Sequence, residues 1–441
     1  MVDKKNIKEK INKLRQTGFF SIFIATVFSK VVTLLGSVIL VRVLSKTDYG
    51  IYSYISNCFT MLFIFNDLGI SSATLQYLTE SLDDKRRQRQ IINYSLKSCL
   101  VVSIITCLLV LLSPYFYPYT MEEARVLTPM LFLVPMIMIA YGLLSMILRA
   151  NFDNRRYGKL QIFITFSTYI TLIIASIIWG VKGAVLSHYI YSILILIYSI
   201  FLANKYIPRD KSTNLENSKL DKKEKRNFIK YALSLQLNNT IGGLLITIDT
   251  FLIGYMIPIP ELIASYNVGS KLPYALNFLS SCIAIYISPH FIKNRNDINW
   301  IKRNFNRLIK YSIIGFGILC VLLIVFAKLI FYILYGTEYY DSIPIYIVLV
   351  IGLFFISAFK NPCANILYSL RKVKVNTITN IVSLVVNFIT NIVFIKLFGI
   401  IGAAITTTGI NIIISIVYFV YLKKYIRKIE MEKVKTEGLK E

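Results

Sequence analysis

The sequence predicts an all-α integral membrane protein with twelve transmembrane helices, arranged as two pseudo-symmetric six-helix bundles around a central cavity. Three observations support this prediction: long apolar runs, positive charge concentrated in alternate connecting segments, and landmarks that recur in both halves of the chain. Of the 441 residues, 56% are apolar and 16% are charged, whereas soluble proteins average about 45–50% and about 25%.

The apolar runs have the length needed to cross a bilayer. About 20 residues at 1.5 Å per residue match a hydrocarbon core of about 30 Å. The twelve predicted spans are residues 17–41, 51–78, 91–113, 126–148, 159–179, 184–203, 231–257, 272–292, 309–334, 343–360, 375–396 and 401–422. The first run is too long for a signal peptide and lacks an A-x-A cleavage site, so we expect a retained helix.

A hydrophilic segment divides these spans into two sets of six. We expect an N-terminal six-helix lobe at 1–203, a cytoplasmic basic linker at 204–230, a C-terminal six-helix lobe at 231–422 and a cytoplasmic basic tail at 423–441. GVKGA at 180–184 joins the fifth and sixth spans, and GIIGA at 399–403 joins the eleventh and twelfth. Such a motif alone is a common tight turn, but its recurrence at the same place favours a duplicated transporter architecture.

Positive charge predicts the orientation in the membrane. With the N-terminus inside, the inside segments carry 40 Lys and Arg residues and the outside loops carry 6. The positive-inside rule therefore places both termini in the cytoplasm. Of the net charge of +26, +25 belongs to the cytoplasmic segments. This charge indicates topology and attraction to anionic membrane lipids, so we expect no nucleic-acid partner.

Motifs for catalysis and cofactor binding are missing from the sequence. There is no G-x-x-x-x-G-K-[ST] loop, nucleophile elbow or H-E-x-x-H. The six Cys lie in or beside apolar segments without a C-x-x-C pair, and two His cannot form a metal centre alone. We therefore expect no enzyme, no cofactor and no metal site, which leaves transport as the default function.

Lys30 is the most informative candidate residue. It lies near the middle of the first span, where a charged Lys costs about 2.5–3.5 kcal/mol on insertion scales. Thr26, Lys30, Thr33 and Ser37 fall within about 60° on a helical wheel, so we expect this stripe to line a hydrated cavity. The alternative is a lysine that snorkels or pairs structurally with a carboxylate.

Two further polar stripes and two acidic residues accompany it. The seventh span presents Gln236 and Asn239, and the eleventh presents Asn380 and Asn387. Polar residues at such positions either line a cavity or hold membrane helices together. Asp249 lies off the stripe of the seventh span. Asp249 and Asp67 are interpreted as residues for ion coupling or for a structural pair with a cation.

Basic residues near span ends complete the candidate site. Arg42, Arg149 and Lys271 lie at such positions, where they either anchor the helices at the interface or contact a ligand. A weakly cationic cavity of low dielectric constant favours an anionic ligand such as a pyrophosphate.

Several segments resemble a known family. LVRVLSKTDYGIY at 40–52 is similar to an R-x-L-s-x-x-x-[FY]-G-x-[FY] entry motif, DLG at 67–69 to a helix 2 motif, and IDTFLIG at 248–254 to the helix 7 region. Asn387 and Asn391 followed by FGIIGAA at 398–404 resemble the N-x-x-x-N…[FY]-G-x-x-G-A-A signature. The ordered set is identified with Wzx-type O-antigen and capsular polysaccharide flippases of the MATE-like flippase superfamily.

This resemblance implies translocation of undecaprenyl-diphosphate-linked oligosaccharide repeat units across the bacterial inner membrane, by alternating access, for surface polysaccharide synthesis. It implies that cavity cations bind the diphosphate, and Lys30 matches that role best. Partners expected with it are a polysaccharide polymerase and chain-length machinery. A MATE-type multidrug or cation antiporter, a peptidoglycan lipid-linked precursor flippase and a non-transporting scaffold for glycan assembly remain the alternatives.

Overall fold

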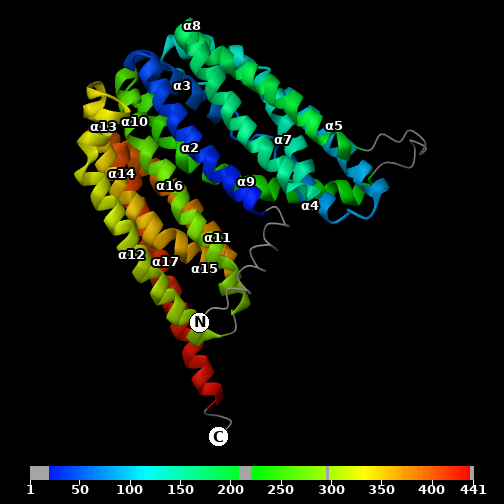
Figure 1. Ribbon diagram of the computed structural model, residues 1–441, viewed down its shortest axis with the longest axis vertical. Coiled ribbons are helices and arrows are strands. Elements are labelled where there is room, and N and C mark those ends of the chain that lie inside the picture. Colours follow the sequence, from blue (N-terminus) through cyan, green and yellow to red (C-terminus); the bar gives the residue numbers. More distant parts are fainter. Residues whose placement is uncertain (1–18, 208–219, 295–296, 371, 438–441) are drawn as a thin grey trace. The chain divides into compact units, whose positions relative to one another are not determined.

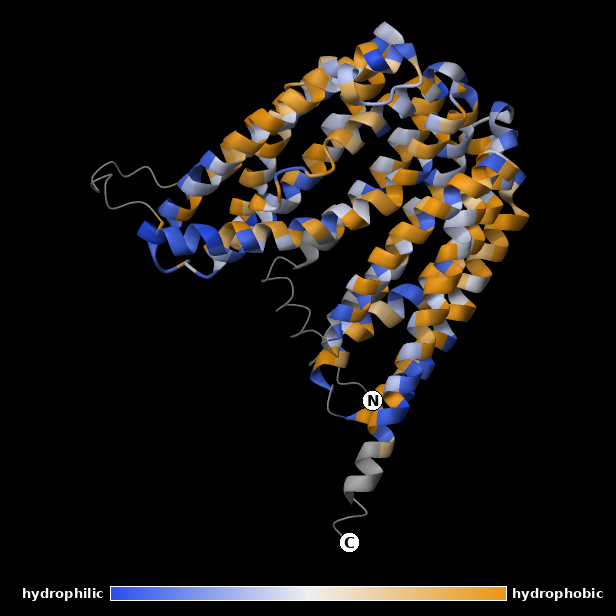
Figure 2. Cartoon of the chain, turned by 180° about the vertical axis from the view of Figure 1, so that it is seen from behind, coloured by the Kyte–Doolittle hydropathy of each residue, from blue (hydrophilic) through white to orange (hydrophobic). Residues whose placement is uncertain are grey.

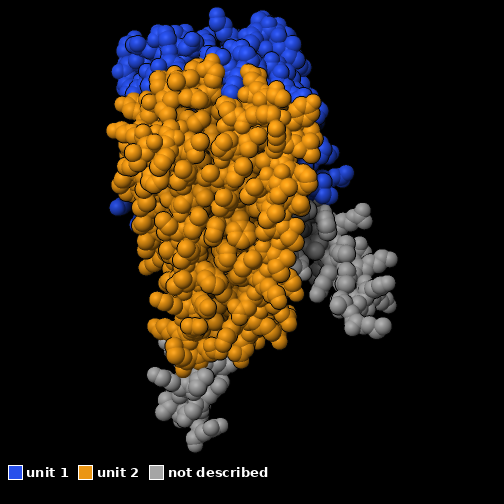
Figure 3. Space-filling model, turned by 90° about the vertical axis from the view of Figure 1, so that its left-hand side faces the viewer, with its two compact units in different colours: residues 1–243 blue, residues 244–441 orange. Residues whose placement is uncertain are grey.

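The computed structural model describes residues 19–207, 220–294, 297–370 and 372–437, in which all regular secondary structure is helical (Figure 1). The chain forms two compact units, unit 1 with residues 1–243 and unit 2 with residues 244–441 (Figure 3). Their boundary falls inside helix α9. The lobe, linker and tail limits expected from the sequence stay predictions, and residues 208–219 of the linker lie outside the described residues.

Unit 1 contains α2 (Phe19–Val43), α3 (Lys46–Leu62), α4 (Ile70–Thr79), α5 (Lys85–Phe116), α6 (Glu122–Leu127), η1 (Pro129–Leu131), α7 (Val134–Ala150), α8 (Asn154–Ala203), η2 (Asn204–Tyr206) and the first part of α9 (Lys222–Met256). Unit 2 contains the rest of α9, then α10 (Pro260–Leu276), α11 (Phe278–Lys293), α12 (Ile298–Val325), α13 (Ala327–Leu334), η4 (Thr337–Ser342), α14 (Ile343–Phe355), η5 (Ile356–Lys360), α15 (Asn361–Ser369), α16 (Val373–Phe398) and α17 (Ile400–Glu437).

The described helices have the lengths of membrane spans. Eight of them are long and apolar enough to cross a bilayer, or nine if the bent pair Glu122–Leu131 and Val134–Ala150 is one span. The predicted spans 51–78 and 272–292 fall on shorter helices of at most 17 residues, or about 26 Å at 1.5 Å per residue. The all-helical membrane fold is confirmed, whereas the count of twelve stays a prediction.

The repeated Gly-x-x-Gly-Ala motif has the same backbone geometry in both units. Gly180 interrupts α8 with φ 56° and ψ −137°, and Gly399 separates α16 from α17 with φ 61° and ψ −146°, a region that favours glycine. A Cβ on Gly183 would lie 1.9 Å from a backbone carbonyl oxygen eight residues earlier, and one on Gly402 would lie 2.0 Å from the equivalent oxygen. The sequence repeat is therefore also a structural repeat.

Each unit has its own apolar core, and both also expose apolar residues. In unit 1, Leu143 and Leu160 belong to a buried cluster that includes the start of α9, and in unit 2 Phe305 belongs to a second cluster. Exposed apolar residues such as Val101 on α5 and Val325 on α12 lie on helices that carry charged residues near their N-terminal ends and are apolar over most of the remaining length (Figure 2). Such surfaces suit contact with lipid.

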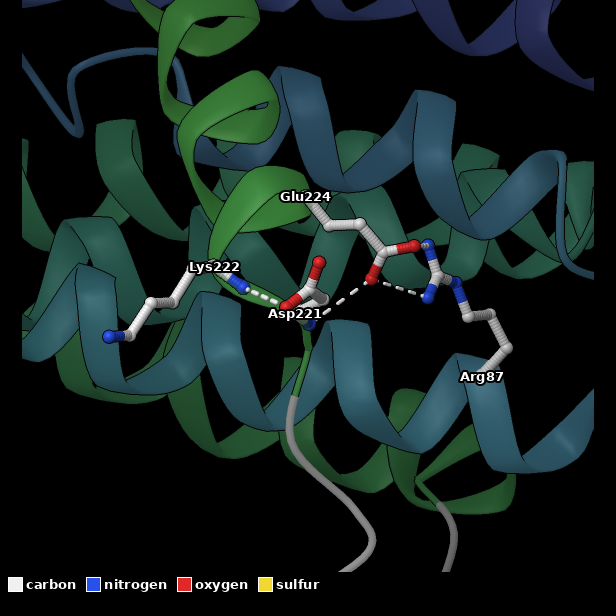
Figure 4. A network of polar contacts seen from close by, with 4 residues as sticks. All are labelled: Arg87, Asp221, Lys222 and Glu224. Atoms are coloured by element: carbon white, nitrogen blue, oxygen red, sulfur yellow. Dashed lines mark hydrogen bonds and ion pairs between the residues drawn. The ribbon is translucent and has the colours of Figure 1, made fainter.

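The beginning of α9 is held within unit 1 by an apolar contact and an ionic contact. Phe228 is fully buried and packs edge-on against Tyr77. The Arg87 guanidinium on α5 donates two hydrogen bonds to the Glu224 carboxylate, at 2.8 and 2.7 Å (Figure 4). The same carboxylate accepts a hydrogen bond from the backbone N–H of Asp221 at 3.2 Å, which satisfies one donor at the helix start.

Candidate functional site

Lys30 lies on a face of α2 that the neighbouring helix α8 leaves open. The contact between α2 and α8 uses Ser29, whose hydroxyl donates to the Gln161 carbonyl at 3.4 Å, and Gly36, where a Cβ would lie 2.4 Å from the Tyr169 ring. Lys30 is about 100° round the helix from Ser29. Its side chain is exposed and has no hydrogen bond or ion pair to a described residue, so the ammonium group is available to a ligand.

The rest of this predicted stripe becomes more buried along α2. Thr26 is exposed, Thr33 is half-buried and Ser37 is buried. The Ser37 hydroxyl donates to the Leu34 carbonyl of its own helix at 2.8 Å. The accessible polar surface of α2 therefore centres on Lys30 and its two threonine neighbours.

The other predicted cations lie near helix ends. Arg42 and Arg149 in unit 1 are exposed, and Lys271 on α10 of unit 2 is half-buried. The Arg149 guanidinium lies 5.7 Å from the centroid of the Tyr157 ring, within the range of a cation–π interaction. Arg42 is about 18 Å from Lys30 along α2, at 1.5 Å per residue. At this separation along one helix, Lys30 and Arg42 do not form one compact anion site.

Asp67 caps a helix. Its Oδ1 accepts a hydrogen bond from the Gly69 N–H at 3.0 Å, and its Oδ2 accepts one from the Ser71 N–H at 2.7 Å. The side chain is buried and precedes α4, in a turn where Leu68 has φ 52° and Gly69 has φ 79°. A carboxylate that binds the first N–H groups of a helix stabilises both the turn and the helix dipole.

Part of the predicted polar stripe on α9 joins helices within unit 1. Gln236 Nε2 and Thr240 Oγ1 donate to the Ile64 carbonyl, at 3.2 and 3.4 Å, in the irregular segment between α3 and α4. A Cβ on Gly69 would lie 2.2 Å from a backbone oxygen of α9, so the two segments are in direct contact. Gln236 thus serves helix packing, the alternative to cavity lining, whereas Asn239 is exposed.

Asp249 is the centre of a buried polar cluster in unit 2. Its Oδ2 accepts hydrogen bonds from the Tyr266 hydroxyl at 2.7 Å and the Thr407 hydroxyl at 2.5 Å, and its Oδ1 accepts one from Asn391 Nδ2 at 2.8 Å. These donors come from α10, α17 and α16, and Asp249 is fully buried. Among the described residues, no Lys or Arg forms an ion pair with it. Charge-assisted hydrogen bonds therefore stabilise the carboxylate.

Asn391 connects this carboxylate to the predicted stripe on α16. Its Nδ2 also donates to Asn387 Oδ1 at 2.9 Å. Its own Oδ1 is buried and has no hydrogen-bond partner among the described residues. Asn380, earlier on the same helix, is half-buried. The cluster therefore gathers carboxylate, amide and hydroxyl oxygens, the donor set that suits a proton or a hard cation.

Sequence reasoning missed two members of this cluster. Thr407 lies in the run 406–408, where nothing in the spacing distinguishes the central hydroxyl from its neighbours. Tyr266 is an aromatic residue in an apolar segment, and such a residue is more often packed than polar. Their proximity to Asp249 required the packing of α10 and α17 against α9.

The repeated apolar helices define a multi-span membrane transporter fold, and solved structures share it. One is the inward-facing conformation of a multidrug resistance MATE family transporter of the MOP superfamily, with a TM-score of 0.73 and 15% identity over 91% of this chain and 96% of that chain. Another is the lipid II flippase MurJ in an inward closed conformation, with a TM-score of 0.72 and 18% identity over 91% and 87%. The chain therefore has the fold of MATE-like flippases.

The sequence comparison shows the family. The profile described as "Polysaccharide biosynthesis protein" matches residues 16–295, and the chain belongs to this family. An uncharacterised membrane protein of Methanocaldococcus jannaschii is 23% identical over 394 residues, which are 83% of this chain and 77% of that protein. The family resemblance expected from the motifs is confirmed, and the chain is a member of the polysaccharide biosynthesis family with the fold that these transporters share.

Proposed function

We propose that this protein translocates undecaprenyl-diphosphate-linked oligosaccharide repeat units across the bacterial cytoplasmic membrane, by alternating access, for O-antigen or capsule synthesis. The observation that carries the proposal is Lys30, an exposed cation in the apolar helix α2 without a partner among the described residues. An unpaired ionisable group in a span is costly, which makes it a functional candidate. A diphosphate would supply an anionic partner for the Lys30 ammonium group.

The accessible polar residues suit the rest of such a substrate. Thr26 and Thr33 lie beside Lys30, Asn239 is exposed and Asn380 is half-buried. We assign these four residues to hydrogen bonds with sugar hydroxyls. Arg42, Arg149 and Lys271 add positive charge for the diphosphate or for lipid headgroups. Ser37, Gln236 and Asn387 already have hydrogen bonds within their own units and contribute by holding the helices.

The membrane orientation belongs to the same proposal. Both termini are cytoplasmic because 40 of the Lys and Arg residues lie on that side against 6 on the other. Membrane lipids surround the helices, and a polysaccharide polymerase with its chain-length machinery takes up the translocated repeat units.

Substitution of Lys30 tests the substrate class. Lys30→Ala abolishes surface polysaccharide in a strain that depends on this protein, while Lys30→Arg retains it because the charge is kept. Lys97→Ala is the matched control, since Lys97 is an exposed lysine on α5, and it leaves polymer output unchanged. All three variants are quantified in membranes by immunoblot. Normal output from Lys30→Ala at normal abundance contradicts the proposal.

Asp249 favours a second candidate, a MATE-type cation antiporter. Membrane-embedded carboxylates bind cationic substrates or coupling ions, and Asp249 is fully buried without a basic partner among the described residues. Expressing cells are challenged with cationic drugs: resistance that Asp249→Asn removes assigns drug export. If this protein instead rescues a strain depleted of its peptidoglycan precursor flippase, its substrate is the lipid-linked peptidoglycan precursor.

A further inference from the structure

A π-helical turn in unit 2 borders a small cavity. The turn η5 joins α14 to α15, and the Asn361 N–H donates to the Ile356 carbonyl five residues earlier. Pro362 explains it, because a proline lacks the N–H group and its ring crowds the carbonyl four residues earlier. π-turns of this kind displace backbone groups from their usual helical partners.

Ser357, inside this turn, has an unsatisfied hydroxyl. The side chain is fully buried, and its Oγ has no hydrogen-bond partner among the described residues. Buried serines in regular helices of the same unit donate to the carbonyl four residues earlier: Ser369 does so at 2.9 Å and Ser383 at 2.6 Å. A buried hydroxyl without a partner costs about 1–3 kcal/mol, so this group needs a partner.

The cavity beside Ser357 has the size of one water molecule. The cavity has a volume of about 10 Å³, close to the minimum of about 10–15 Å³ that holds one water molecule. The residues lining it come from α11, α12, η5 and α15: Ser280, Ile283, Ile287, Leu308, Ser357, Pro362 and Asn365.

Two further polar groups on this wall have free acceptor capacity. Ser280 donates to the Asn277 carbonyl at 2.9 Å and accepts from Asn361 Nδ2 at 2.5 Å, which leaves one lone pair. Asn365 donates through Nδ2 to the Asn361 carbonyl at 2.7 Å, which leaves Oδ1 as an acceptor. With the Ser357 hydroxyl as donor, the wall offers the three hydrogen bonds typical of an internal water.

We propose that this cavity is a binding site for one ordered water molecule, which accepts a hydrogen bond from Ser357 and donates to Ser280 and Asn365. The water connects α11 with α15 across the π-turn and replaces the backbone acceptor that the turn withdraws. A bare cation does not fit, because none of the lining residues is a carboxylate and an uncompensated buried charge is strongly unfavourable.

The sign of a stability change tests this site. Ser357→Ala removes one of the three hydrogen bonds of the water, so the full-length protein in lipid nanodiscs melts lower, by ~2–4 °C. Ser192→Ala on α8 is the matched control, because Ser192 is also fully buried with an unpartnered hydroxyl in the described chain and borders none of the described cavities. This control raises the melting midpoint. A rise for Ser357→Ala as well overturns the proposal.

A second measurement detects the water directly. Hydroxyl-radical labelling in ¹⁸O-water marks side chains that border an ordered water, so we expect ¹⁸O on Leu308 or Pro362, which line the cavity. Ser357→Val fills the cavity and removes this label. Absence of label in the unsubstituted protein, with normal labelling of exposed loop residues, overturns the proposal independently of stability.

Discussion

Asp249 Oδ1 accepts a hydrogen bond from Asn391 Nδ2 at 2.8 Å, although 142 positions separate the two residues in the chain. The bond joins α9, the helix at the boundary between the two units, to α16, the helix that carries the predicted asparagine stripe. Because both residues are fully buried, any change of charge at Asp249 acts directly on the contacts among α9, α10, α16 and α17.

Neutralising Asp249 separates ion coupling from a purely structural role. Asp249→Asn removes the negative charge but keeps the shape, so we expect translocation in proteoliposomes to lose its dependence on sodium ion or on pH. Initial rates are measured while each ion gradient is varied alone. Asp341→Asn is the control, because Asp341 is an exposed carboxylate of unit 2 that accepts a hydrogen bond from Ser265. Unaltered ion dependence in Asp249→Asn rejects a coupling role.

Removing Asn391 is expected to destabilise unit 2. Asn391→Ala deletes one donor to a buried carboxylate, which costs about 1–3 kcal/mol. Asn380→Ala, at a half-buried position of the same helix, changes stability by less than about 0.5 kcal/mol. Thermal unfolding of both variants in the same detergent measures the difference, and equal melting midpoints refute the predicted contribution.

The paired glycines predict parallel effects in the two units. Ala at Gly183 or Gly402 places a Cβ about 2 Å from a backbone oxygen, so both variants lose folded protein. Gly142→Ala is the control, since no atom lies within 4 Å of its Cβ position, and it stabilises α7 by up to about 1 kcal/mol. Fluorescence-detected size-exclusion chromatography compares the folded yields. Normal yield of Gly183→Ala shows that the close contact is dispensable.

The Arg87–Glu224 pair is expected to contribute little to stability. The two side chains are 29% and 37% exposed, and solvent screens such a pair, so a double-mutant cycle with Arg87→Ala and Glu224→Ala gives a coupling of only about 0.5 kcal/mol. The coupling decreases as salt is raised. A coupling above about 2 kcal/mol at high salt excludes this screened surface geometry.

Apolar run length and motif recurrence predicted most of the fold. The glycines at 180 and 399 were noted from sequence alone, and both have positive φ. By contrast, the division of the span 51–78 into α3 and α4 depends on the Asp67 carboxylate, which accepts hydrogen bonds from two backbone N–H groups. Helical periodicity contains no information about such a turn, because it is fixed by local capping.

The candidate site was only partly predictable for a related reason. Lys30 could be found because a charge within an apolar run is conspicuous in one dimension. Polar residues are ambiguous, since Gln236 packs against the Ile64 carbonyl while Asn239 stays exposed, and only the packing of neighbouring helices distinguishes them. Thr407 became a partner of Asp249 through tertiary structure alone.

The turns at Gly180 and Gly399 also determine where a reporter of membrane orientation can be inserted into the chain. At Gly180 and Gly399 one helical segment leads directly into the next, so no length of unpaired backbone is available to a protease or an inserted epitope. Residues 117–121, between α5 and α6, are without helix, and Pro118 among them is exposed, which is where irregular backbone tolerates insertion. A reporter for the side of the membrane therefore belongs in this segment and not at the two glycine turns, where an insertion would disrupt the paired helices.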